Sequence, residues 1–269
     1  MGLFKPVVFF KQKVVAGGIP IQPEATAFLT ATGITDPTIS SAVNELVYDL
    51  KNAGVWSNMV AIYPFVGGTA TTHKYNLVNP VDTDAGFRLS FNGVSHSSNG
   101  ITNGGGSNNG AFTHIKLITN IVQNDNYGSV YVRNNTSVGH DYGAISGGNG
   151  MQLASNNGGN FNTKAMDNVN ADIANSDSRG FYQASRIVST EYYKQKNTTR
   201  NTVTQTSVTP PASEWIGIGL IATAEVNAGV QPSNKNYAYA AFGAGLTTTE
   251  MDDHYTAVQK FQTTLGRQV

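Results

Sequence analysis

The sequence predicts a mainly β protein, an antiparallel β-sandwich or jelly roll, with a helix pair before it and a helix at its end. Short apolar or alternating segments recur from Met59 to Phe242, and turns rich in Gly and Asn separate them. No helical pattern alternates with these segments, which favours antiparallel strands in two packed sheets. We therefore divide the 269-residue chain into an extended arm (1–22), a helical collar (23–56) and a jelly-roll domain (57–269).

The bulk composition argues against several classes of protein. Charged residues make up 13% of the chain, about half the usual share. The formal net charge is zero, so we expect no charge-based partner such as nucleic acid or an anionic membrane. The absence of cysteine removes disulfides and thiolate metal sites, and no segment is long and apolar enough to span a bilayer.

The arm is predicted to be extended, because Val and Phe favour strands and a Gly-Gly pair with a nearby Pro ends the pattern. Lys11 and Lys13 interrupt its apolar run, so we do not expect a signal peptide. The arm is too short to form a core of its own, and its apolar side therefore needs its own domain or another subunit as partner. The residues expected to mediate oligomerisation or attachment here are Val7, Val8, Phe9 and Phe10.

Two helices are predicted in the collar. Pro23 suits the first position of a short helix that ends at Gly33, and Asp36 followed by Pro37 caps a longer one. Gly54 is placed to close the longer helix. Its apolar stripe comprises Ile39, Ala42, Val43, Leu46, Val47 and Leu50. Two interpretations remain open: the stripe packs on the β-domain, or Leu46 and Leu50 join several copies in a bundle.

The β-domain is expected to contain strands wherever apolar or alternating residues recur. Residues 92–110 and 155–179 are polar and rich in Gly or Asn, so we expect loops there. Residues 215–222 form a continuous apolar run, which predicts a central strand buried on both faces. The other expected strands are 59–66, 85–91, 112–122, 129–133, 143–146, 152–154, 181–189, 191–195 and 237–242.

The chain is expected to end in an amphipathic helix. Thr247 and Glu250 form a capping box, and Leu246 and Met251 are placed to pack as its hydrophobic staple. The predicted buried stripe comprises Met251, Tyr255, Val258, Phe261 and Leu265. Gly266 then closes the helix.

Several of these segments together resemble a known group of phage proteins. The similarity is to concanavalin A-like, laminin-G-like jelly-roll domains in tailed-phage virion proteins. It is found in the amino-acid sequences of residues 62–80, 181–190, 215–221 and 238–269. Residues 28–56 resemble the helical segment often found before these domains. The sequence as a whole resembles proteins of phages that infect gut Bacteroidota, including the crAss-like group. The resemblance implies a role in head fibres, tails or the adsorption apparatus on the virion exterior. It brings no fixed catalytic residues, and such domains are often suspected of binding glycans.

An enzymatic role finds little support in the residues. Retaining glycosidases hold two carboxylates about 5–5.5 Å apart, and no Glu-x-Asp-x-x-Glu or similar pattern occurs. Gly217-Ile218-Gly219 matches a loose dinucleotide pattern, but the glycines lie inside a predicted strand and no helix follows. The five histidines show no metal-ligand spacing, so we expect each to be a loop or core hydrogen-bonder. We therefore expect a protein that is not an enzyme and has no catalytic residues.

Neither a metal nor another cofactor is expected. The segments 124–126 and 82–84 offer oxygen ligands for Ca²⁺, but the same residues favour turns, and turns are the preferred interpretation. Glycan binding would need exposed aromatic rings beside amides and carboxylates. The alternative is that these aromatic residues are strand residues in the core. The candidate glycan-binding residues are Tyr127, Tyr142, Phe161, Tyr192 and Tyr193.

Taken together, these features predict a non-enzymatic structural protein of a phage virion, anchored by its arm to the capsid or tail. We expect copies of the chain to form a homotrimer through the arm and collar. The alternative is a lectin-like module whose main task is to bind host surface polysaccharide. A polysaccharide-degrading enzyme is the third and weakest hypothesis.

Overall fold

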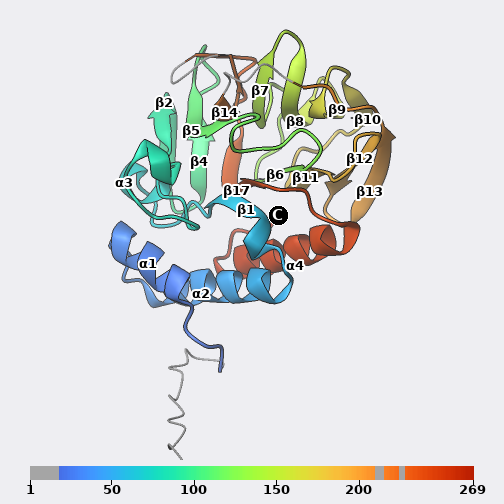
Figure 1. The fold of residues 1–269 in the computed structure, drawn as a ribbon. Coiled ribbons are helices and arrows are strands. Elements are labelled where there is room, and N and C mark those ends of the chain that lie inside the picture. Colours follow the sequence, from blue (N-terminus) through green and yellow to red (C-terminus); the bar gives the residue numbers. More distant parts are fainter. Residues whose placement is uncertain (1–17, 210–214, 224–227) are drawn as a thin grey trace, which may run out of the picture.

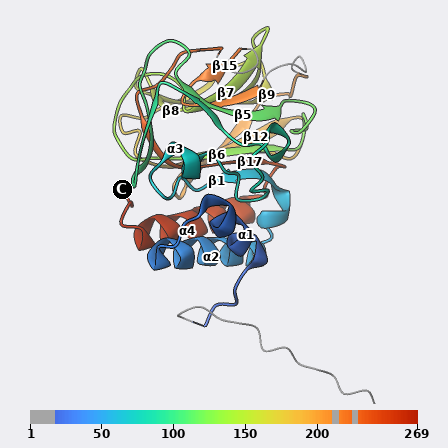
Figure 2. The same cartoon turned by 90° about the vertical axis from the view of Figure 1, so that its left-hand side faces the viewer.

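A computed structural model describes residues 18–209, 215–223 and 228–269, which form three stacked layers (Figures 1 and 2). A layer of helices lies under one β-sheet, and a second sheet packs on the opposite face of the first. The prediction of a mainly β, antiparallel sandwich is therefore confirmed. The predicted residues Val7–Phe10 of the arm lie outside the described residues.

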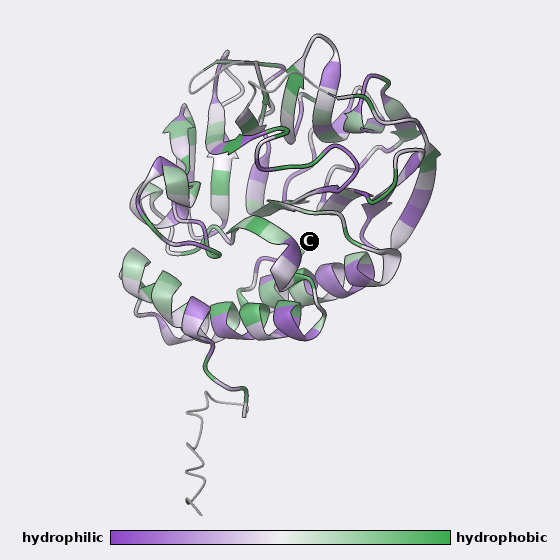
Figure 3. Ribbon diagram, in the orientation of Figure 1, coloured by the Kyte–Doolittle hydropathy of each residue, from purple (hydrophilic) through white to green (hydrophobic). Residues whose placement is uncertain are grey.

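The helical layer contains α1 (Pro23–Thr32), α2 (Pro37–Asn52) and α4 (Thr248–Thr264). The predicted helix starts are confirmed: Asp36 caps α2 by accepting from the backbone N–H of Ile39, and Thr247 forms a capping box with Glu250. Figure 3 shows hydrophobic and hydrophilic residues alternating along α2, as expected of a helix with one buried face. Three single-turn helices lie outside this layer: α3 (Ala70–His73), η1 (Trp56–Asn58) and η2 (Asp84–Gly86).

The sheet next to the helices has eight strands. Their order is β13 (Thr199–Thr204), β12 (Glu191–Lys196), β11 (Gly180–Arg186), β6 (Asn126–Val132), β17 (Asn236–Gly243), β4 (Gly100–Asn103) and β3 (Val94–Ser97), with β1 (Met59–Tyr63) also paired to β17. Neighbouring strands in this sheet pair antiparallel.

The outer sheet has nine strands. Their order is β10 (Ala171–Ala174), β9 (Asn160–Asp167), β8 (Asn149–Asn157), β7 (Tyr142–Ser146), β14 (Trp215–Ile218), β5 (Gly110–Lys116) and β2 (Ser90–Asn92). β15 (Ile221–Ala222) and β16 (Gly229–Val230) form a hairpin attached to the edge of β7. The single strand expected at 215–222 is divided into β14 and β15, because Gly219 between them adopts a positive φ of 82°.

Two hydrophobic cores hold the layers together. One fills the space between the two sheets and includes Tyr63, Val130, Leu153 and Ile218. The other lies between the eight-stranded sheet and the helices and is formed by residues of α2, α4 and the strands facing them. Among the described residues, no helix is long and apolar enough to cross a membrane.

The collar stripe packs within its own chain. Leu46 and Leu50 are 1% and 0% exposed, in the core that also contains Met251 and Val258 of α4. The prediction that these two leucines join copies is therefore wrong, because α4 and the sheet already cover them. The other interpretation, packing on the β-domain, is confirmed.

Two expected loops contain strands instead. Residues 92–110 hold the hairpin of β3 and β4, and residues 155–179 hold all of β9 and β10. The strand β13 was also not predicted. Conversely, the expected strand at 85–91 begins in η2 and continues as irregular chain at 87–89, and only Ser90–Asn92 pair as a strand.

Candidate functional site

Four of the five predicted glycan-binding aromatic residues lie in the cores. Tyr127, Tyr142 and Tyr192 are 0% exposed and Phe161 is 4% exposed, so a sugar ring cannot stack on them. The prediction is wrong for these four because their strand positions face the interior of the sandwich or the helical layer. Tyr193 remains partly exposed on β12, with its hydroxyl 3.4 Å from Glu191 Oε1. The predicted aromatic platform is therefore not formed.

A polar groove of about 330 Å³ lies instead on the outer face of the nine-stranded sheet. Gln152 alternates along β8 with the core residues Met151 and Leu153, so its side chain points away from the sandwich. The β15–β16 hairpin forms the opposite wall. The residues that line the groove are His140, Ile145, Gln152, Asn157, Asn162, Lys164, Asn170, Ile221, Thr223, Val230 and Gln231.

A chain of amides forms the floor of this groove. Gln152 Nε2 donates to Asn162 Oδ1 at 2.7 Å and to Asn170 Oδ1 at 2.8 Å. Asn162 Nδ2 in turn donates to Asp172 Oδ1 at 2.5 Å. Because both hydrogens of Gln152 Nε2 are used, the orientation of this amide is fixed and its Oε1 is left as an acceptor. No described residue donates a hydrogen bond to that Oε1 or accepts one from Asn170 Nδ2.

Lys164 adds a cationic donor beside the amides. It pairs directly across the strands with Gln152, and its Nζ donates to the carbonyl of Gly148 at 2.8 Å. A lysine ammonium has three hydrogens, so two remain for a ligand. The groove lining thus offers fixed donors and acceptors, and it contains one lysine and no Asp or Glu.

A buried ion pair supports the groove from beneath. Asp141 and Lys235 are both 0% exposed, and their charged atoms lie 3.0 Å apart. Asp141 also accepts from the Tyr237 hydroxyl and from the backbone N–H of Ser155, while Lys235 donates to the carbonyl of Asn156. These bonds tie together the three chain segments that carry His140, Asn157 and Gln231. Buried ion pairs add little stability, so we interpret this one as a positioning device.

A second buried pair positions Asn170. Arg186 and Asp167 are both 0% exposed, with Arg186 Nη2 3.3 Å from Asp167 Oδ2. The Asp167 carboxylate also accepts from the backbone N–H groups of Ala165 and Val169 at 3.1 and 3.2 Å. The turn that follows β9 is therefore fixed, and it presents the exposed Asn170 to the groove.

His140 lies at the side of the groove in the neutral form. Burial lowers its pKa to about 4, and its side chain is 4% exposed. Its Nδ1 has no hydrogen-bond partner among the described residues. A polar atom left without a partner at a groove wall is uncommon in folded proteins.

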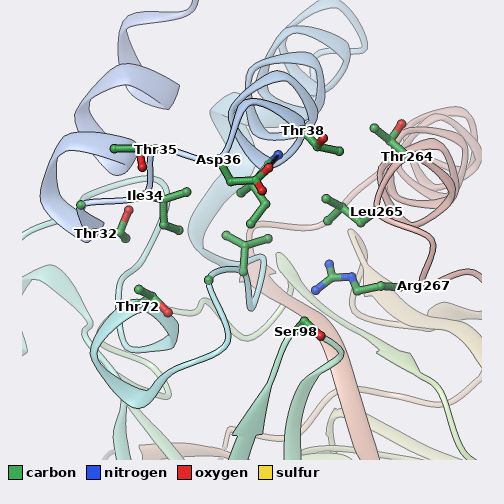
Figure 4. A pocket seen from close by; sticks show the side chains of 14 residues that line it. Thr32, Ile34, Thr35, Asp36, Thr38, Thr72, Ser98, Thr264, Leu265 and Arg267 are labelled. Atoms are coloured by element: carbon green, nitrogen blue, oxygen red, sulfur yellow. Dashed lines mark hydrogen bonds between the residues drawn. The ribbon is translucent and has the colours of Figure 1, made fainter.

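A second cavity of about 580 Å³ separates the helical layer from the loops of the sandwich (Figure 4). Ile34, Leu265 and several threonines line it, with Asp36 above and Arg267 to one side. The Arg267 guanidinium is 2% exposed and donates to the carbonyls of Pro64, Phe65 and Ala238. Arg267 therefore links the end of α4 to the sandwich through these hydrogen bonds.

The segments weighed as Ca²⁺ ligands are engaged in other contacts. Asp82 and Asp84 form ion pairs with Arg88, and Asp82 also pairs with Lys74. Asp125 accepts from the backbone N–H of Gly245 at 2.6 Å. Among the described residues, no group of three or more metal-ligating side chains is found.

Two of the histidines form a pair between α3 and β3. His73 Nδ1 lies 3.0 Å from His96 Nδ1, and His73 Nε2 accepts from the backbone N–H of Gly68. His73 must then carry its proton on Nδ1 and donate it to His96. The expectation that the histidines are loop or core hydrogen-bonders is confirmed here.

Comparison with known proteins finds only distant structural likenesses. No protein-family model and no curated protein matches the chain. It is similar to domain 4 of AbnA, an extracellular arabinanase from Geobacillus stearothermophilus solved with arabinotriose, at 13% identity and a TM-score of 0.49, over 73% of this chain and 98% of that one.

Two other similar structures are larger proteins. Trypanosoma rangeli sialidase in complex with sialic acid matches at 11% identity and a TM-score of 0.48, over 74% of this chain and 33% of that one. The binding domain of botulinum neurotoxin serotype D matches at 9% identity and a TM-score of 0.48, over 75% and 52%. At this distance, what the chain does has to be argued from its own residues.

Proposed function

We propose that this chain is a non-enzymatic carbohydrate-binding domain and that the groove on the nine-stranded sheet is its binding site. The observation that carries the proposal is the fixed amide array of Gln152, Asn162 and Asn170 with Lys164 beside it. Sugar hydroxyls both donate and accept hydrogen bonds, so they match a floor with an acceptor and donors at set positions.

The walls of the groove suit the rest of a sugar ring. Ile145, Ile221 and Val230 line it with apolar surface, against which the C–H groups of a pyranose can pack. A volume of about 330 Å³ accommodates a short saccharide at the lower end of the range for ligand sites, about 300–1,000 Å³. The proposed ligand is therefore one or two residues of a longer glycan.

Binding without hydrolysis fits the lining better than catalysis. Glycoside hydrolysis by the common mechanism needs two carboxylates facing one bond. The lining contains none, nearby Asp141 and Asp167 are held in buried ion pairs, and the single exposed carboxylate next to the floor, Asp172, accepts from Asn162. We propose that the chain adheres to the glycan and leaves it intact.

The sequence resemblance supplies a setting for this adhesion. We propose that the domain belongs to the exterior of a tailed-phage virion and contributes to attachment to host surface polysaccharide. The described chain begins ahead of α1, beside the helical layer and away from the nine-stranded sheet (Figure 2). Anchoring through that side would present the groove outward.

The test is binding of the full chain to an array of bacterial polysaccharide fragments, followed by calorimetry with the selected oligosaccharide. Asn170→Ala removes a groove donor from an exposed position and is expected to raise Kd about tenfold, or ~1.4 kcal/mol. Asn168→Ala is the matched control, because Asn168 is exposed on the same turn and does not line the groove. An equal loss in both variants, or no binding to any glycan, would overturn the proposal.

A further inference from the structure

An apolar groove lies between α1 and α2, on the face of the molecule opposite the carbohydrate site. Its volume is about 390 Å³, and its floor includes Ala25, which is 1% exposed. Ile21 and Leu29 are half-buried along its length. The complete lining is Ile21, Ala25, Thr26, Leu29, Pro37, Ser40, Ser41 and Asn44. No charged side chain is among these residues.

Asn44 fixes the chain that enters α1 beside this groove. Its Oδ1 accepts from the backbone N–H of Gln22 at 2.7 Å, and its Nδ2 donates to the carbonyl of Pro20 at 3.1 Å. Asn44 is 3% exposed and satisfies both of these backbone groups. The residues before Gly18 therefore start from a fixed point next to the groove.

The segment before Gly18 matches the groove in chemistry. It contains the apolar run Val7–Phe10, and a segment of this length is too short to form a hydrophobic core by itself. Residues 1–17 carry three lysines and no acidic residue, whereas residues 18–56 carry four acidic residues and one lysine. These residues sum to +3 and −3, and counting Lys260 of α4, which pairs with Glu45 and Asp49, leaves −2 beside the groove, still opposite in sign to the segment.

The reach of the segment favours a second copy as the acceptor. Phe10 precedes Gly18 by eight residues, which span up to about 26 Å when extended at ~3.3 Å per residue. The groove of the same chain begins at Ile21, three residues or at most about 10 Å from Gly18, which is far less than this reach. We therefore take the groove of a second copy as the acceptor.

We propose that residues Val7–Phe10 of one copy dock in the α1–α2 groove of the next copy. Arm and groove are different surfaces, so the contact is head-to-tail, and a closed ring forms when the rotation between copies closes. A trimer is the ring expected for a fibre-like assembly. This inference does not depend on carbohydrate binding, since the two sites lie on opposite faces.

The chain's lack of cysteine allows a direct test. Val8→Cys and Ser41→Cys are made as single variants of the full chain, mixed in equal amounts and oxidised. We expect a disulfide-linked dimer in the mixture at several times the yield of either variant alone. Thr30→Cys replaces Ser41→Cys in the control, because Thr30 is exposed on α1 and lies outside the groove.

Two results would overturn the proposal. One is a cross-linked yield no higher with Ser41→Cys than with Thr30→Cys. The other is cross-linking of a Val8→Cys/Ser41→Cys double variant into a ring-closed monomer at a rate independent of concentration, which would place the arm in its own groove.

The oligomeric mass provides an independent measurement. The full chain is expected to sediment as a trimer, and Leu29→Asp is expected to convert it to a monomer by placing a charge in the groove. Ala27→Asp is the matched control, an exposed position on the same helix outside the lining. A monomeric wild-type chain, or equal dissociation by both variants, would also contradict the proposal.

Discussion

His254 on α4 is fully buried between two tyrosines, and its hydrogen bonds determine its protonation. Its Nδ1 lies 2.8 Å from the Tyr127 hydroxyl, and its Nε2 lies 2.8 Å from the Tyr239 hydroxyl. The Tyr127 hydroxyl donates its hydrogen to Gln183 Oε1, so it accepts from His254 Nδ1–H. Nε2 is then the acceptor for Tyr239. This arrangement satisfies a neutral imidazole and has no place for a second proton.

Stability should therefore fall on acidification. Burial lowers the pKa of His254 from 6.5 to about 3, so below pH 6.5 the unfolded chain binds a proton that the folded chain does not. The free energy of unfolding that the neutral His254 contributes is fully present above pH 6.5. It falls by up to ~1.4 kcal/mol per pH unit as the pH decreases toward 3. The measurement is the free energy of urea unfolding from pH 4 to pH 8.

A variant separates His254 from the other histidines. His73 and His140 also have pKa values lowered by burial, to about 3 and about 4, and contribute with the same sign. His254→Gln is expected to be less stable at pH 7 and to show a shallower slope below pH 6. Parallel curves for variant and wild type would refute the assignment of this pH dependence to His254.

At the scale of elements, α2 is held by its stripe against α4 and the eight-stranded sheet. Leu46 is 1% exposed at the centre of this contact. Leu46→Ala is expected to cost about 2–5 kcal/mol, since deleting a buried leucine loses transfer energy and leaves a cavity. Thermal unfolding measures the loss. Asn52→Ala, at an exposed position of the same helix, should change stability by no more than about 0.5 kcal/mol.

The elements that could be predicted from the sequence are those with a local signal. The helices were found because Asp36 and Thr247 cap them and their apolar stripes have helical spacing. Five strands, β3, β4, β9, β10 and β13, were missed because their segments are rich in polar residues, and three of them, β3, β10 and β13, also lie at sheet edges. Each of these edge strands pairs with the strand next to it in the chain, in the hairpins β3–β4, β9–β10 and β12–β13, so the signal that was missing is an apolar one.

The candidate groove could be predicted only in part. Phe161 was predicted to bind glycan but faces the core, and the side chains that line the proposed groove are its neighbours Asn162 and Lys164 on the other face of β9. The alternation of Phe161, Thr163 and Ala165 with these two polar residues was the available signal. The contributions of His140 and Asn170 come from distant segments brought together by buried ion pairs.

At the scale of the whole molecule, the layers separate two surfaces. The amide groove is lined by residues of the outer sheet, and the α1–α2 groove by residues of the helical layer. The eight-stranded sheet lies between that layer and the outer sheet (Figures 1 and 2). Two cores of packed side chains stand between them. Substitutions at the two sites should therefore act independently, since the free-energy changes caused by substitutions at distant sites without shared partners usually add.

Independence of the sites leads to a prediction about avidity that rests on both proposals. If a ring of copies presents several amide grooves on one side, a polysaccharide surface can engage more than one groove at once. Linked binding of this kind raises apparent affinity by about 10²–10⁴ without any new contact. Leu29→Asp should therefore weaken binding to immobilised polysaccharide by at least about 100-fold and leave Kd for a short soluble oligosaccharide unchanged.

Asn170→Ala provides the contrasting variant for this measurement. It should weaken both kinds of binding, because it alters each groove and leaves the number of linked grooves unchanged. Surface plasmon resonance on the immobilised polysaccharide and calorimetry with the oligosaccharide give the two affinities for each variant. If Leu29→Asp lost affinity for the soluble oligosaccharide as well, the two faces would be coupled and the separation of adhesion from assembly would be wrong.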